Sequence, residues 1–253
     1  MDVDASLHEP PTTQLPNPIP IDPELVYGCD EIGFMPSRGA KRRVIGPRNR
    51  SIQHQQGDGG RENTTVIVTI CADGTATKPT VIFKGKALGQ SDKGWTDGEI
   101  GVEWIQDFHE QTKDKSLGRA RLLLVDGHNS HYTRGFLRFA RKNRIHVLCY
   151  PAHGTHVYQG LDVVIFAVLK QNWTQERDAY YRQTRQRLTK KNFLKIYGEA
   201  HIRTLTKENI KTAFRVTGVI PYDPTIVSDK LAPSKETSSQ GELPATQPSP
   251  VVA

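Results

Sequence analysis

Residues 121–170 read RLLLVDGHNSHYTRGFLRFARKNRIHVLCYPAHGTHVYQGLDVVIFAVLK, and this stretch decides the fold. The apolar runs 121–125 and 145–149 are typical of strands that are buried on both faces of a sheet. Between them, residues 132–143 place apolar side chains at helical spacing, with arginines on the opposite side. A strand, a helix and a second strand in this order predict a parallel pair joined by a crossover helix.

The segment 161–169 (LDVVIFAVL) is ambiguous, because its β-branched residues favour a strand. Its apolar positions continue at three- and four-residue spacing through Phe166 to Trp173, which is the period of a helix. We therefore predict a helix. Asp162 then falls in its first turn, where the helix dipole favours a negative charge.

Upstream of this stretch the chain favours strands. Residues 24–30 (ELVYGCD) are predicted to form a strand that ends at the acid Asp30, after which the chain turns. The β-branched run 64–71 precedes an Asp-Gly turn signal, so residues 80–83 are its expected antiparallel partner. An amphipathic helix over 101–112 follows.

Three antiparallel strands followed by strand–helix units predict an α/β fold, a mixed sheet flanked by helices. Smaller helices are expected over 188–205 and 207–215. Residues 1–20 and 226–253 are rich in Pro, Ser, Thr and Gln without periodicity, so we expect a disordered leader and a disordered tail. The folded domain then occupies residues 21–225.

Composition sets limits on the partners. The formal net charge of +7 suggests a polyanion, for which nucleic acid is the usual candidate, although an ordinary basic protein has the same balance. No apolar run approaches the ~18 residues of a membrane helix, so we expect no membrane span. The three cysteines form no CxxC pair and are expected to be buried thiols in a reducing compartment.

Three acids, Asp30, Asp126 and Asp162, each stand at an end of a predicted element. If the first and fourth strands are neighbours, these carboxylates meet, and their mutual repulsion is tolerable only with a cation. Oxygen ligands favour Mg²⁺ or Mn²⁺, and two such ions ~3.5–4 Å apart would assist displacement at a phosphodiester. Isolated acids at strand ends are also common as caps or turn residues. Glu31 is expected to point to the opposite face.

Four blocks of the chain carry a family resemblance: CDEIGF, LLLVDGHNSH, PAHGTHVYQGLDVVIFAVLK and LTKENIKTAFRVTGVIPYDP. Over residues 24–225 they resemble the DDE endonuclease domain of pogo-like transposases, in the Tc1/mariner superfamily. The resemblance implies an RNase H-like fold with a C-terminal helical extension, and metal-dependent DNA strand cleavage and transfer in the nucleus. It also implies Asp30, Asp126 and Asp162 as catalytic residues and ligands of two Mg²⁺ or Mn²⁺ ions. A homo-oligomer is compatible with it.

The chain also departs from the family pattern. The helix-turn-helix region that usually precedes this domain is not expected here, and Asp223 stands where Asn is common. Gly160 stands where Pro is usual, and we expect it to loosen the entry to the helix of Asp162. A truncated or domesticated remnant that binds DNA without completing transposition is therefore the alternative hypothesis.

Basic residues and histidines near the four blocks are candidate DNA contacts, although a solvated surface would have the same composition. Two HxxH pairs, His128/His131 and His153/His156, could also form a zinc site, but we favour hydrogen bonds to backbone or phosphate. The candidate nucleic-acid-binding residues are Arg38, Lys41, Arg42, Arg43, His131, His156, Arg182, Arg185 and Arg187.

Overall fold

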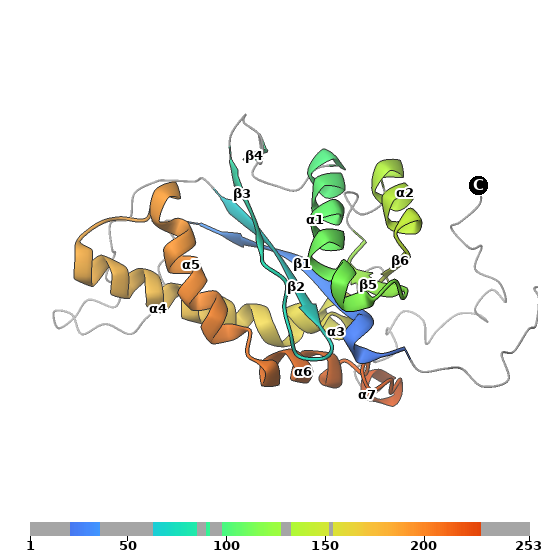
Figure 1. Ribbon diagram of the computed structural model, residues 1–253. Helices are drawn as coiled ribbons and strands as arrows, with labels where there is room; N and C mark the ends of the chain where they lie inside the picture. Colours follow the sequence, from blue (N-terminus) through green and yellow to red (C-terminus); the bar gives the residue numbers. More distant parts are fainter. Residues whose placement is uncertain are drawn as a thin grey trace, which may run out of the picture.

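The computed structural model describes residues 21–35, 63–84, 90–91, 98–127, 133–151 and 154–228. Within these ranges, six strands form one sheet in the order β4-β3-β2-β1-β5-β6 (Figure 1). The strands are β1 (Val26–Phe34), β2 (Thr64–Cys71), β3 (Thr80–Lys84), β4 (Gln90–Ser91), β5 (Arg121–Val125) and β6 (Ile145–Cys149).

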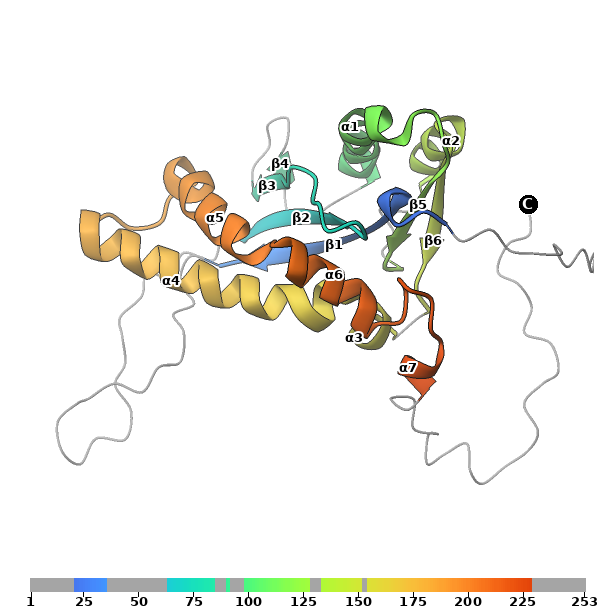
Figure 2. The same ribbon diagram turned by 60° about the horizontal axis from the view of Figure 1, so that its bottom comes forward.

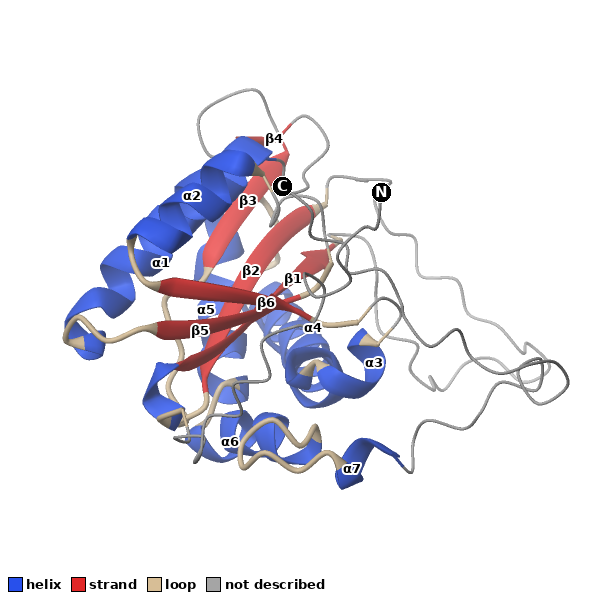
Figure 3. Cartoon of the chain, turned by 90° about the vertical axis from the view of Figure 1, so that its right-hand side faces the viewer, coloured by secondary structure: helices blue, strands red, loops and turns tan. Residues whose placement is uncertain are grey.

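Helices cover both faces of this sheet. Helices α1 and α2 lie on one face, and α4, α5 and α6 lie on the other (Figures 2 and 3). The helical elements are η2 (Pro23–Leu25), α1 (Gly98–Ser116), α2 (Arg134–Lys142), α3 (Thr155–Tyr158), the π-helical η4 (Leu161–Ile165), α4 (Phe166–Thr184), α5 (Lys190–Thr204), α6 (Lys207–Val216) and α7 (Thr225–Ser228).

Strand β1 is longer than the sequence predicts. It does not end at Asp30 but continues to Phe34, and the predicted turn after Asp30 is wrong. The reason is its antiparallel partner β2, whose pairing runs from Tyr27↔Cys71 to Phe34↔Thr64. Asp30 therefore lies in the middle of β1, opposite Val68 of β2, two residues beyond the last residue that pairs with β5.

The crossover unit is confirmed. Strands β5 and β6 pair in parallel, from Arg121↔Ile145 to Val125↔Cys149, and α2 connects them. Strand β5 also pairs in parallel with β1, so the first and fourth long strands are neighbours. The antiparallel pairing of β2 with β3 is confirmed as well.

The core on the α1 side of the sheet is aromatic. Trp104 is only 5% exposed, and its ring stacks on those of Phe108 and Phe136 at centroid distances of 5.6 and 6.2 Å. Tyr27 meets the edge of Phe108 at 5.1 Å. Burying such rings is among the largest contributions to core stability.

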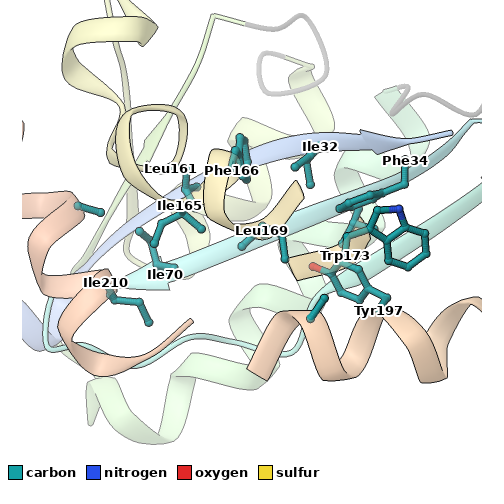
Figure 4. Close-up of a cluster of buried hydrophobic side chains, with 14 of the residues drawn as sticks. Ile32, Phe34, Ile70, Leu161, Ile165, Phe166, Leu169, Trp173, Tyr197 and Ile210 are labelled. Carbon is teal, nitrogen blue, oxygen red and sulfur yellow. The ribbon is translucent and has the colours of Figure 1, made fainter. Parts of the chain in front are cut away.

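The core on the other face is built around the ambiguous segment, which is helical as predicted. One side of η4 and α4 packs against β1 and β2, and its apolar residues follow the helical period (Figure 4). The ring centroid of Trp173 on α4 lies 5.0 Å from that of Phe34 and 5.0 Å from that of Phe193. Strand β1 and helices α4 and α5 therefore meet in one aromatic cluster. The apolar side of η4 and α4 is formed by Leu161, Ile165, Phe166, Leu169 and Trp173.

The first residue of β5 is a buried cation that joins three elements. Arg121 is 2% exposed and donates to the Thr112 hydroxyl of α1 at 2.6 Å. It also donates to the carbonyl of Asn143 after α2 at 2.8 Å, and lies 2.9 Å from Nδ1 of His109. Because a buried charge is costly without hydrogen bonds, these contacts fix where α1 and α2 sit on the sheet.

The fold has a pH-sensitive position at His201 on α5. Burial lowers the pKa of His201 from 6.5 to about 4, and its Nδ1 lies 3.0 Å from the Tyr197 hydroxyl. As pH falls below 6.5, the imidazole of His201 becomes protonated in the unfolded chain but stays neutral in the folded chain. The contribution of His201 to the free energy of unfolding is therefore fully present above pH 6.5. It is lost progressively toward pH 4, and the loss is on the order of 2–3 kcal/mol.

Urea unfolding of the wild type and of His201→Gln between these pH values measures this loss. The substitution removes the titrating ring, so its free energy of unfolding is expected to fall less steeply over the same range. Equal slopes for the two proteins would assign the pH dependence to other groups.

Candidate active site

The register of the sheet aligns two of the three acids. Val26 pairs with Leu122 and Gly28 with Leu124, so continuing the ladder by two residues places Asp30 level with Asp126. Side chains two residues apart on a strand share a face. Leu124 belongs to the core beneath α4, and both acids therefore face the helix that carries Asp162.

The third acid comes from η4. Asp162 is exposed and lies in the first turn of this helix, whose buried residues Leu161 and Ile165 pack against β1. Three elements that are distant in the sequence thus bring Asp30, Asp126 and Asp162 into one region, as the sequence predicts.

The acids are close enough to affect one another's ionisation. Burial raises the pKa of Asp30 well above its usual value, and the charges of Asp162 and Asp126 raise it further. The backbone N–H of Glu31 donates to the Asp30 carboxylate at 2.7 Å and opposes this rise. Asp30 is 8% exposed, so water screens the repulsion poorly.

Asp162 has a milder environment. Partial burial raises its pKa and the charge of Asp126 raises it further, while Lys170 and His156 lower it. Lys170 lies two turns along the same helical run, and His156 lies on α3. The expected DNA contact His156 is therefore next to the acids. Lys170 was not predicted, although its spacing from Asp162 places it on the same side of the helix.

The donor chemistry fits a hard divalent cation. Among the described residues, no three His, Cys, Asp or Glu side chains are already arranged as a ligand set. Asp30, Asp126 and Asp162 nonetheless supply three carboxylates whose charges oppose one another, and a cation would relieve this repulsion.

Two neighbours of the site could not be predicted from the sequence. Gln159 is 2% exposed, and its side-chain amide donates to the carbonyl of Cys29 at 3.3 Å. The backbone carbonyl of Gln159 accepts a hydrogen bond from the N–H of Val163 at 3.1 Å. Gln159 therefore connects the strand of Asp30 to the helix of Asp162. Tyr150 follows β6, and burial and the Asp30 charge raise its pKa.

Gly160 has a packing role that the sequence does not predict. Its backbone is helical, and a Cβ at this position would lie 2.5 Å from the carbonyl oxygen of Ala213 on α6. Real Cβ atoms essentially never approach this closely. Glycine is therefore needed because α6 packs directly on the start of the helix that carries Asp162.

The three described arginines among the candidate DNA contacts do not lie beside the acids. Arg182, Arg185 and Arg187 are exposed at the far end of α4, twenty or more residues beyond Asp162. At 1.5 Å of rise per residue this separation is about 30 Å. Outside the described residues lie Arg38, Lys41, Arg42, Arg43 and His131, together with His128 and His153 of the two HxxH pairs.

The comparisons with known proteins agree with this geometry. The family model described as "DDE superfamily endonuclease" matches residues 61–214, which include Asp126 and Asp162 and exceed half of the chain. The chain belongs to this family. Asp30 precedes the matched residues, and its assignment to the site rests on the β1–β5 register.

Solved structures of the mariner transposase Mos1 have a similar fold. The pre-cleavage Mos1 transpososome matches with a TM-score of 0.59 at 12% identity, covering 83% of this chain and 57% of that one. The Mos1 catalytic domain with Raltegravir and Mn matches with a TM-score of 0.51 at 12% identity, covering 83% and 86%. These matches confirm the predicted RNase H-like fold.

A curated relative from Cochliobolus lunatus carries the name "MFS-type transporter clz9". It is 36% identical over 231 residues, which cover 82% of this chain and 24% of that protein. This DDE-family chain thus spans about a quarter of its relative. Across the ranges that the structure describes, we find no helix with the length and apolar character to cross a membrane.

Substituting Gly160 tests the packing of the helix start. We expect Gly160→Ala to lower the free energy of unfolding by about 1–3 kcal/mol, because the new methyl group forces α6 away. The matched control is Gly198→Ala on α5, where a Cβ has nothing within 4 Å. That change is expected to stabilise by about 0.5–1 kcal/mol. Urea unfolding measures both, and a neutral Gly160→Ala would disprove the close approach.

Removing the Asp30 charge tests the repulsion among the acids. In metal-free buffer at neutral pH we expect Asp30→Asn to raise the free energy of unfolding by about 1–3 kcal/mol, because a buried, repelled charge is lost. Asp114→Asn, an exposed change on α1, is the control and should be near neutral. A destabilised Asp30→Asn protein would argue against like-charge repulsion.

Proposed function

We propose that this chain cleaves DNA strands with divalent metal ions held by Asp30, Asp126 and Asp162. The observation that carries the proposal is the convergence of these acids from β1, the end of β5 and η4, with pKa shifts that report their mutual repulsion. Membership of the DDE superfamily endonucleases supports it, since the matched residues include two of the acids.

The acids of the site differ in exposure to solvent, and their proposed roles differ accordingly. Buried Asp30 is held by the N–H of Glu31 and fixes the inner side, whereas exposed Asp162 borders the solvent from which DNA would enter. Divalent ions bound here would stabilise the charge that develops on the phosphodiester oxygens. His156 and Lys170, which already act on Asp162, are placed to contact the phosphate backbone.

We further propose two Mg²⁺ or Mn²⁺ ions, a pogo-like placement within the Tc1/mariner superfamily, strand transfer after cleavage, nuclear action and a homo-oligomer. Mos1 paired-end complexes with Mn and with Mg support the choice of metal. The Mos1 paired-end complex with the left transposon end supports DNA as the partner.

A second candidate function is DNA binding without cleavage, as in a domesticated remnant. The exposed arginines beyond Arg182 favour it, because they lie too far from the acids to depend on them. Binding of this kind is sensitive to salt and independent of sequence, and it would survive loss of the Asp126 carboxylate.

A plasmid-nicking assay separates the two functions. We expect the wild type to nick supercoiled DNA with Mg²⁺ or Mn²⁺ and not with EDTA. Asp126→Asn should lose at least ~100-fold in rate, because one ligand carboxylate is removed. The control Asp114→Asn should retain the wild-type rate.

Nicking that is equal in the wild type and Asp126→Asn would reject the assigned site. Absent nicking with intact DNA binding would favour the second function instead.

A further inference from the structure

The turn between α4 and α5 carries an unusual concentration of positive charge. Residues 179–198 contain six basic residues and no acidic one. All six are exposed, and Figure 1 shows this turn at the left end of the molecule, away from α3, β5 and β6. We call this surface the basic tip, consisting of Arg182, Arg185, Arg187, Lys190, Lys191 and Lys195.

The basic tip has a defined backbone. Arg185 ends α4 in the left-handed conformation with φ of 57°, and its N–H donates to the carbonyl of Tyr181 at 2.9 Å. A reciprocal capping box between Thr189 and Asn192 starts α5. Lys190 donates to the carbonyl of Lys84 at 2.5 Å, which ties the tip to the end of β3. The cations are therefore presented on a fixed frame.

Two cations of the tip, Arg182 and Arg185, take no part in the ion pairs of this region. Glu176 pairs with Arg203, and Asp178 pairs with Arg177 at 2.9 Å. Neither Arg182 nor Arg185 forms an ion pair with another described residue. Clustered like charges cost stability, and a polyanionic partner would offset that cost.

The distance from the acids sets the length that a polyanion must span to reach both regions. The helical run from Asp162 to Arg182 spans about 30 Å, and a duplex rises about 3.4 Å per base pair. A straight duplex that reaches both regions therefore covers about nine base pairs between them. Duplex DNA is stiff over this length.

We propose that the basic tip binds the backbone of duplex DNA about nine base pairs from the phosphodiester that lies at the acids. The proposal rests on the proposed function for its anchor at the acids. The tip then measures the length of duplex flanking the cleavage position, and contacts it regardless of sequence.

The test measures salt dependence of binding as a function of duplex length. Fluorescence anisotropy with duplexes of about 8, 14 and 24 base pairs gives the slope of log Kd against log salt. The wild-type slope is expected to steepen between the shortest and middle duplex, when both regions are reached together.

The test variant removes three charges from the tip: Arg182→Gln, Arg185→Asn and Lys191→Gln, with Asn chosen because it tolerates the left-handed conformation. We expect its slope on the longer duplexes to fall by about 2–3, at 0.9 per lost phosphate contact. The matched control removes three exposed charges from α2, and its slope should change by less than one; its substitutions are Arg134→Gln, Arg138→Gln and Arg141→Gln.

Equal losses in the tip and control variants would overturn the proposal, because the effect would then be one of net charge. A wild-type slope that does not change with duplex length would also overturn it, as would equal competition by polyglutamate. If the proposal for the basic tip is correct, the salt slope of Asp126→Asn still changes with duplex length. Loss of cleavage and loss of binding at the tip therefore give different results.

Discussion

The parallel pairing of β1 with β5 is the constraint on which the site depends. Its register, with Val26 opposite Leu122, sets Asp30 level with Asp126 and turns both toward η4. Because side chains alternate along a strand, a slip by one residue would send Asp30 to the α1 face, which Glu31 occupies now. The register itself is fixed by burial, since Tyr27 and Cys29 pack into one core and Val26 and Ile32 into the other.

The sequence predicts the elements whose patterns are local. The crossover unit of β5, α2 and β6 follows from two apolar runs around an amphipathic stretch, and the helical period of 161–173 correctly outweighs its β-branched composition. The end of β1 could not be predicted in this way. Residues beyond Asp30 alternate too briefly to indicate a strand, and they become one because β2 pairs with them as far as Phe34.

The same distinction between local patterns and distant contacts applies to the candidate site. Asp30, Asp126 and Asp162 could be chosen because carboxylates at element ends suggest a cation, and the family resemblance agrees with the choice. The packing role of Gly160 could not be predicted, since it is set by Ala213, a residue remote in the sequence. The role of Gln159 could not be predicted from the sequence either, because only the structure shows that its side-chain amide donates to the carbonyl of Cys29.

The contact of Gly160 with Ala213 also bears on how much of the chain makes a working unit. All three acids precede residue 163, so a fragment ending after α5 would retain every carboxylate. It would nonetheless lack α6, whose Ile210, Ala213 and Phe214 complete the core behind η4. Helix α6 thus forms part of the core behind the acidic site, although none of the three site carboxylates lies on it.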